Sequence, residues 1–263
     1  MSPLQPPAIR FHNIAKRFPG YTAVEGIDLD VQAGRFLSVV GPSGCGKSTL
    51  LNMAAGLMEP SQGRVEMFGE PLEGINRRAG YMFQQEALLP WRTVLGNIAF
   101  GPTMAGTKAA EAARTAQDWI KRVGLDGFAD RYPHQLSGGM RKRVAMAQTW
   151  ITNPEIILMD EPFGALDVHT RLRMESEILG LWAETKKTVM FVTHDLEEAI
   201  ALSDEVVVLS AGPASRIVGR YEVNLERPRN LIDIKTDTRF TAIYGSIWRD
   251  LRGEVLKSYE RHE

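Results

Sequence analysis

The chain contains 263 residues, with 31 Lys and Arg against 32 Asp and Glu, which gives a formal net charge of −1. Apolar residues make up 44% and charged residues 24%, as in ordinary globular proteins, and this excludes intrinsic disorder. The balanced charge argues against a general nucleic-acid or anionic-membrane binder, and the single cysteine, Cys45, excludes a disulfide framework and a Cys-based zinc cluster. Neither a signal peptide nor a run of about 20 apolar residues is found, so we expect the chain to be soluble unless a partner holds it at a membrane.

Strands and helices are expected to alternate along most of the chain. Their hydrophobic spacing predicts strands at 8–11, 27–31, 36–40, 64–68, 79–83, 156–159, 188–192 and 205–209. Helices are expected at 47–55, 108–123, 138–151, 169–184, 195–202 and 238–259. This order implies a mainly parallel sheet that is covered on both faces. The helical block between about 86 and 154 is interpreted as an insertion into that fold.

A glycine-rich segment between the strand 36–40 and the following helix fits the pattern G-x-x-x-x-G-K-[ST]. Glycines let backbone N–H groups wrap a polyphosphate, and the helix N-terminus favours negative charge. Lys47 is expected to reach the β- and γ-phosphates, Ser48 to ligate Mg²⁺ and Thr49 to contact the α-phosphate. The alternatives are a glycine-rich turn and, for Cys45, a nucleophile, although no His or Asp is spaced to activate it. The expected nucleotide-binding residues here are Gly41, Pro42, Ser43, Gly44, Cys45, Gly46, Lys47, Ser48 and Thr49.

Two acids, Asp160 and Glu161, end an apolar strand directly before Pro162. Asp160 is the expected ligand on the Mg²⁺ side, and Glu161 is the candidate base for the attacking water. Both can serve one site only if the chain turns there, because neighbouring strand residues point to opposite faces; the alternative is an acidic pair that caps the next helix. His194 follows the strand 188–192 and is either a structural residue or a partner of the γ-phosphate and of the water held by Glu161.

These motifs follow one another in an order that resembles an ABC-type ATPase subunit over about residues 8–225. After the phosphate loop, Tyr-Met-Phe-Gln84 is similar to the Q-loop, and Leu-Ser-Gly-Gly-Met140 is similar to the LSGGQ signature. Leu-Met-Asp-Glu161 resembles Walker B, Phe-Gly-Ala-Leu-Asp167 the D-loop and Val-Thr-His194 the switch histidine. The resemblance implies an α/β P-loop NTPase core with a mainly parallel sheet, an antiparallel β portion at the N-terminus and an inserted helical subdomain.

We expect one ABC ATPase domain over residues 1–263. Its nucleotide-binding core is expected to comprise 8–85 and 155–235. The helical signature subdomain is placed at 86–154, and a C-terminal helical extension at 236–263.

The resemblance implies that the chain binds ATP and Mg²⁺ as part of a homodimer. Ser137, Gly138 and Gly139 open a helix whose N–H groups can grip a phosphate. By resemblance, that phosphate belongs to ATP held by the second subunit, so two identical chains clamp two ATP molecules head to tail. Asp167 is placed at the nucleotide site through the D-loop.

Two further roles follow from the same resemblance. Gln84 is expected to contact Mg²⁺ or the attacking water and to link the nucleotide to the helical insertion, which makes it catalytic together with Glu161 and His194. Phe18 aligns with the aromatic residue that stacks on adenine, and Tyr21 is the rival for this role.

The chain departs from the family pattern at two positions. Met140 stands where the signature has Gln, and Gln148 stands where the family often has Arg. Because Ser137 and its glycines are intact, we expect hydrolysis to survive these departures. The basic run Arg141-Lys-Arg143 is interpreted as a solvated face or an interface rather than a nucleic-acid site.

Two segments resemble the nitrate, sulfonate and taurine importer branch: Gln85-Glu-Ala-Leu-Leu-Pro-Trp91 and Phe240-Thr-Ala-Ile-Tyr-Gly-Ser-Ile-Trp248. One phosphate loop and one signature indicate a separate ATPase subunit, as in prokaryotic importers. Its expected partners are a second copy, integral membrane permease subunits and, indirectly, a substrate-binding protein, but no nucleic acid. Ala87–Trp91 is interpreted either as the seat for a permease helix or as core. The expected location is the cytoplasmic face of the cell membrane, through the permease.

Two other functions are weighed against this one. A soluble ABC ATPase could remodel a nucleic-acid or iron–sulfur assembly complex, but the long coiled-coil insertion and the tandem ATPase domains of such proteins are not found here. A small-molecule P-loop kinase has no use for the signature or the switch histidine.

Overall fold

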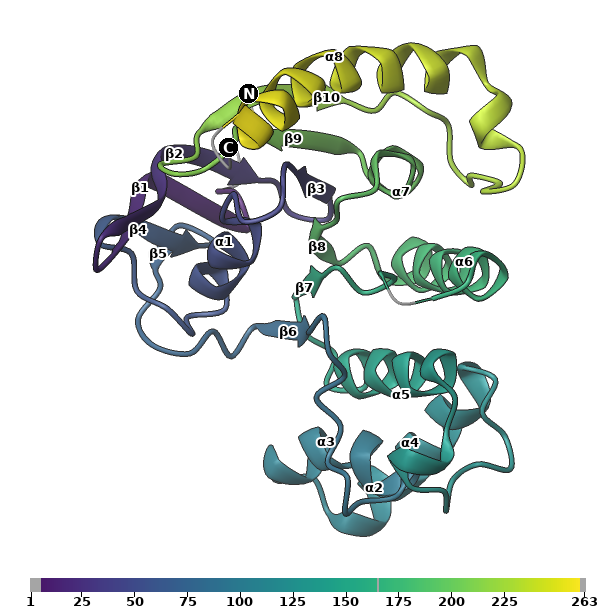
Figure 1. Cartoon of the computed structure of the whole chain (residues 1–263). Helices are drawn as coiled ribbons and strands as arrows, with labels where there is room; N and C mark the ends of the chain where they lie inside the picture. The colour runs from purple at the N-terminus through teal and green to yellow at the C-terminus, as the bar shows by residue number, and fades with distance from the viewer. Residues whose placement is uncertain (1–5, 165, 261–263) are drawn as a thin grey trace, which may run out of the picture.

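The computed structural model describes residues 6–164 and 166–260, and within them the chain forms a four-stranded sheet, a six-stranded sheet and the helices around them (Figure 1). The strands are β1 (Ile9–Phe18), β2 (Tyr21–Val31), β3 (Phe36–Val40), β4 (Gln62–Met67), β5 (Glu70–Pro71), β6 (Ala79–Met82), β7 (Ile156–Asp160), β8 (Thr188–Val192), β9 (Glu205–Leu209) and β10 (Ile217–Glu222). The α-helices are α1 (Lys47–Ala54), α2 (Val94–Ile98), α3 (Phe100–Met104), α4 (Ala109–Arg122), α5 (Gly138–Trp150), α6 (Val168–Thr185), α7 (Leu196–Leu202) and α8 (Thr238–Glu260). The short 3-10 helices are η1 (Pro133–Gln135) and η2 (Ile234–Thr236).

The larger sheet has the strand order β10-β9-β3-β8-β7-β6. Neighbours from β9 to β6 run parallel, and β10 alone in this sheet pairs antiparallel, with β9. The segments that follow β3, β6, β7 and β8 therefore leave the sheet at the same edge, where parallel sheets bind their ligands. The predicted mainly parallel sheet is confirmed.

The smaller sheet, β2-β1-β4-β5, is antiparallel and confirms the expected N-terminal β portion. The strands expected at 8–11 and 27–31 were too short, because β1 and β2 extend toward each other up to the turn at Gly20. Asn13 has a φ of 47°, and the pairing register shifts there. This bulge breaks the two-residue alternation from which strands are recognised.

Several short elements were not expected from the sequence. Helices α2 and α3 span five residues each, too few to show a helical period. Strand β5 has only two residues, and β10 is an edge strand whose side chains are half-buried or exposed. Their hydrophobic pattern is accordingly weak.

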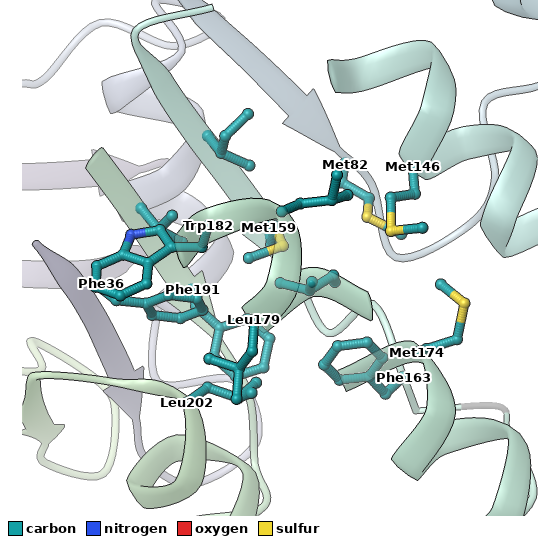
Figure 2. Packing of buried hydrophobic residues seen from close by; sticks show 14 of the residues in the cluster. Phe36, Met82, Met146, Met159, Phe163, Met174, Leu179, Trp182, Phe191 and Leu202 are labelled. Carbon is teal, nitrogen blue, oxygen red and sulfur yellow. The ribbon is translucent and has the colours of Figure 1, made fainter. Parts of the chain in front are cut away.

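The large sheet separates two apolar cores. Along β7, Ile157 and Met159 face the core formed with α5, α6 and α7, whereas Ile156 and Leu158 face the core formed with α1 and the small sheet. Figure 2 shows the first core, where the Phe36 ring meets Trp182 edge-on with 6.1 Å between ring centroids. Burial on both faces explains why these strands are continuous apolar runs.

Helices α2 to α5 are the inserted helical portion of the fold: α5 lies beside β6, and α2 to α4 lie beyond it, away from the sheets, in Figure 1. The chain enters this group after β6 and returns from α5 to β7. The exact limits expected for the subdomain, 86–154, stay a prediction. In the described part of the chain, no helix has both the length and the apolar character that a membrane span requires.

Candidate functional site

The phosphate loop joins β3 to α1. Its buried residues are Gly41, Pro42, Cys45 and Lys47, and its exposed residues are Ser43, Gly44 and Ser48. The Lys47 side chain folds back over the loop, where its Nζ donates to the carbonyl oxygens of Gly41 at 2.9 Å and Pro42 at 3.1 Å. This places an ammonium group and the N-terminus of α1 around one concave backbone, an arrangement that suits a polyphosphate.

Two loop residues have structural reasons for their identity. Gly46 has a φ of 93°, and a Cβ atom there would come 2.6 Å from Cγ1 of Val24, so only glycine fits. The Cys45 side chain is fully buried, and burial raises the pKa of its thiol. A buried thiol with a raised pKa is a poor nucleophile, which argues against the alternative that Cys45 acts as a nucleophile.

Ser48 and Asp160 connect the end of the phosphate loop to β7. The Ser48 hydroxyl donates to Oδ1 of Asp160 at 3.0 Å. Burial raises the pKa of Asp160, while this hydrogen bond acts in the opposite direction. A hydroxyl and a carboxylate are oxygen donors of the kind that Mg²⁺ prefers, and that ion keeps several waters, so two protein ligands beside a phosphate fit it. No cluster of three or more metal-ligating His, Cys, Asp or Glu side chains occurs among the described residues.

The side chain of Glu161 contacts the other two residues expected to be catalytic, Gln84 and His194. Its φ of 41° turns the chain at the end of β7, which is the turn that a shared site with Asp160 requires. Oε2 of Glu161 lies 3.3 Å from Nε2 of Gln84 and 3.2 Å from Nδ1 of His194. Gln84 follows β6 and His194 follows β8, so the parallel sheet brings them to one carboxylate oxygen from opposite sides of β7.

The signature residues form a second group at the N-termini of α5 and α6. The hydroxyl of Ser137 accepts from the N–H of Met140 at 3.3 Å, and Oδ1 of Asp167 accepts from the N–H groups of His169 and Thr170, both at 3.1 Å. The pKa of Asp167 is lowered first by a hydrogen bond from the Thr170 side chain and then by those from the backbone N–H groups of Thr170 and His169. Each of the two side chains therefore caps its helix.

The two helix starts pack against each other at Gly139, where a Cβ atom would come 2.7 Å from Cγ2 of Thr170. Ser137 is exposed, and Gly138 and Gly139 are half-buried. Among residues 6–164 and 166–260, no hydrogen bond or ion pair joins this group to the phosphate loop or to Glu161. Ala165 of the expected D-loop lies outside the described residues.

The two candidate adenine partners flank the turn between β1 and β2. Phe18 is 40% exposed and Tyr21 is 42% exposed. The ammonium of Lys16 lies over the Phe18 ring, whereas the Tyr21 hydroxyl donates to the carbonyl oxygen of Gly44 at 3.1 Å. Tyr21 therefore supports the phosphate loop directly, and the choice of adenine partner stays open.

The interpretation of Arg141-Lys-Arg143 as a solvated face or an interface is wrong at its central residue. Lys142 is only 2% exposed, and its Nζ donates to the carbonyl oxygen of Gln84 and lies 3.7 Å from Oε1 of Glu86. Burial lowers the pKa of Lys142, and Glu86 acts against that shift. Spacing could have revealed this role, because Lys142 lies three and seven residues before the buried Ala145 and Thr149.

The departures from the family pattern have distinct surroundings. Met140 is partly buried and packs against the larger core. Gln148 lines a groove of about 240 Å³ between the helical group and the segment after β6. Phe83 and Ala87 line the same groove, and Trp91 beyond them is 71% exposed. Leu88 instead packs against the core, so the core interpretation of the stretch 87–91 holds for this residue, and the seat for a permease helix stays a prediction.

Two buried carboxyl groups, Glu175 on α6 and Glu198 on α7, occupy the region between these helices. Burial raises the pKa of each to about 7. Around Glu175, the charges of Glu198 and Asp195 raise its pKa further, while those of Lys235 and Arg171 oppose the shift. A protonated Glu175 is therefore part of the folded state below neutral pH.

Glu175→Gln should flatten the pH dependence of stability. Folded Glu175 loses its proton near pH 7, and an ordinary glutamate does so near 4.5. Between these values the unfolded chain binds fewer protons, so the free energy of unfolding falls as the pH rises. Urea unfolding at about pH 5 and about pH 8 measures this effect. Between these two pH values, the free energy of unfolding of the wild type should fall by on the order of 2 kcal/mol more than that of Glu175→Gln. The exposed control Glu59→Gln should keep the wild-type slope, and an unchanged slope in Glu175→Gln would contradict this explanation.

Comparison with known proteins identifies the family. The ABC transporter family model matches residues 24–164, just over half of the chain. An uncharacterised ABC transporter ATP-binding protein of Methanocaldococcus jannaschii is 49% identical over 90% of this chain and 86% of its own length. The taurine import ATP-binding protein TauB of Escherichia coli K12 is 44% identical over 86% of this chain and 90% of its own length.

Solved structures agree with these relatives. A dimeric bacterial ABC transporter cassette superposes with a TM-score of 0.74 at 31% identity, over 83% of this chain and all of that one. A post-hydrolysis state of such a cassette, bound to ADP and phosphate, gives the same TM-score at 30% identity. The chain belongs to the ABC transporter family as its ATP-binding cassette, and it is an ATPase.

Proposed function

We propose that the chain is the ATP-hydrolysing subunit of an ABC importer for a small solute such as taurine, another sulfonate or nitrate. The observation that carries the hydrolytic part is the Glu161 carboxylate, which meets Gln84 and His194 next to the Ser48–Asp160 pair. The importer part is supported by the similarity to a taurine import ATP-binding protein along most of both chains.

In this proposal, each side chain at the sheet edge has one task. Lys47 and the N–H groups of the phosphate loop bind the β- and γ-phosphates, and Ser48 and Asp160 hold Mg²⁺, which neutralises phosphate charge. Glu161 accepts a proton from the water that attacks the γ-phosphate. Gln84 and His194, which flank the same carboxylate oxygen, orient that water.

The signature group acts on a second copy of the chain. Ser137, Gly138 and Gly139 lie apart from the phosphate loop of their own chain and present the N-terminus of α5 at the surface. Two chains related by a twofold axis would place each signature against the ATP of the other and form two identical sites. The dimeric cassette among the similar structures supports this arrangement.

The groove between α5 and the segment after β6 is the proposed seat of a permease helix. Phe83 and Ala87 line it, and Trp91, four residues after Ala87 in the sequence, exposes a large apolar ring to solvent. Aromatic side chains of this kind anchor protein interfaces. The permease would hold the chain at the cytoplasmic face of the membrane, and the substrate-binding protein would contact only the permease.

Glu161→Gln is expected to bind ATP and to hydrolyse it about 10²-fold to 10⁴-fold more slowly, because the amide cannot accept the proton from water. With ATP and Mg²⁺, this variant should elute from a sizing column as a dimer. Phosphate release by purified protein measures the rate, and turnover at the wild-type level would remove Glu161 as the base.

The control for dimer formation places a bulky, positively charged side chain at Ser137 in the signature. Glu161→Gln combined with Ser137→Arg should bind ATP with the same affinity but elute as a monomer, since the arginine side chain fills the space of the partner's phosphate. A stable ATP-bound dimer in the double variant would contradict the shared site.

Lys142→Met is expected to lower kcat about tenfold and leave the KM for ATP unchanged, because the carbonyl of Gln84 loses a charged hydrogen-bond donor. Methionine has a similar length and suits a buried site, so the fold should persist. Lys121→Met, at an exposed position on α4, is the matched control. Steady-state kinetics that give wild-type kcat for Lys142→Met would show that Gln84 does not depend on this contact.

Trp91→Ala should weaken retention of the chain by its permease, since the exposed ring leaves water only when the permease docks. Co-purification of tagged permease from detergent measures this retention, and uptake of labelled taurine into proteoliposomes tests the transported solute. Ile232→Ala is the control, because Ile232 is 75% exposed and distant in sequence from the groove. Equal retention of both variants would place the permease elsewhere.

A further inference from the structure

The C-terminal helix α8 is built into the nucleotide-binding core. Phe240, Ile247 and Leu251 are at most 6% exposed and belong to the larger apolar core. Figure 1 shows α8 running across β9 and β10, and α7 contacts it as well. The helix also buries a carboxylate, Glu254, which is 7% exposed. A carboxylate is retained at such a depth when it satisfies specific donors.

Glu254 binds the segment that follows β9. Its Oε2 accepts from the backbone N–H of Ala211 at 2.8 Å, and its Oε1 accepts from Nζ of Lys257 at 2.6 Å. The lysine side chain is 59% exposed, whereas Ala211 is buried. Glu254 therefore makes a buried hydrogen bond to the loop 210–216 and an exposed one to its own helix.

The loop 210–216 is in turn paired with β2. The N–H of Ala214 donates to the carbonyl of Thr22 at 2.7 Å, and the N–H of Ser215 donates to that of Ala23 at 3.1 Å. In the other direction, the N–H of Glu25 donates to the carbonyl of Ser215 at 3.0 Å. The loop thus extends the small sheet by a short bridge beside β2.

Both partners of this bridge touch the phosphate loop. From β2, Val24 packs against Gly46, and the Tyr21 hydroxyl donates to the carbonyl of Gly44. From the loop 210–216, a Cβ atom on Gly212 would lie 3.4 Å from that same carbonyl oxygen and 3.0 Å from the hydroxyl of Tyr21. These contacts support the outer part of the phosphate loop around Gly44, which is exposed to solvent.

We propose that Glu254 is a positioning residue for ATP binding: through Ala211 it holds the loop 210–216, which together with β2 keeps Gly44–Gly46 in the shape that wraps the phosphates. The proposal rests on the ATP binding of the family and is independent of the permease, the transported solute and the importer assignment. Glu254 contacts neither the reacting water nor Glu161, so its effect falls on the affinity for ATP and not on the chemical step.

The test compares Glu254→Ala with Glu254→Gln in the full chain. Alanine removes the acceptor of the Ala211 N–H, and we expect the Kd and KM for ATP to rise about tenfold while kcat at saturating ATP stays within about twofold of the wild type. Glutamine keeps an oxygen acceptor on a side chain of the same length, so it should restore ATP affinity to within about twofold. Titration with ATP by calorimetry gives the Kd, and phosphate release gives kcat and KM.

Arg252→Ala, at an exposed position on the same helix, is the control and should leave ATP affinity unchanged. Should Glu254→Ala fail to fold, Glu254→Asp replaces it, because the shorter carboxylate keeps the charge but does not reach Ala211. A folded variant with wild-type Kd would overturn the proposal, and so would a lower kcat at unchanged KM or an equal loss in Glu254→Gln. ATP binding without solute transport would contradict the importer assignment and leave this inference intact.

Discussion

The parallel hydrogen bonding of β3, β6, β7 and β8 is the constraint on which the site depends. Each strand is followed by one part of the chemistry: the phosphate loop, Gln84, Glu161 or His194. Because neighbouring parallel strands end at the same edge of the sheet, the strand order by itself brings these residues close together. The strands are buried on both faces between two apolar cores, so the edge is held rigidly enough for one carboxylate oxygen to face both a glutamine and a histidine.

The helical group is tied to this edge through a charge. Lys142 places a buried ammonium on the carbonyl of Gln84, and Glu86 lies near enough to offset the cost of burial. α5 therefore has the signature at its N-terminus, and less than two helical turns later its Lys142 donates a hydrogen bond to the carbonyl of Gln84. A displacement of the helical group would move the Gln84 backbone with it. In the proposed function, this backbone would couple nucleotide binding to the position of the permease.

The phosphate loop depends on more of the fold than its own motif. The loop is joined to β3 and α1 at its two ends, and its residues Gly44 and Gly46 are contacted by β2 and by the loop 210–216. The latter is held by α8, so the end of the chain contributes to the same site as its beginning. Phe240, Ile247 and Leu251 of the C-terminal helix pack in the larger apolar core, and under the proposal above this helix also helps to shape the phosphate loop.

Most elements of the fold and the order of the site motifs could be predicted from the sequence, because buried parallel strands are short apolar runs and each motif is contiguous. The residues of the phosphate loop, Asp160 and Glu161 carry their chemistry in the pattern itself. Local patterns could not predict contacts that join distant segments: Gln84 lies 77 residues from Glu161, and Lys142 lies 58 residues from Gln84. The bulge at Asn13, the contact of Lys142 with the Gln84 carbonyl and the position of Glu254 arise only when sheet register and helix packing bring separate segments together.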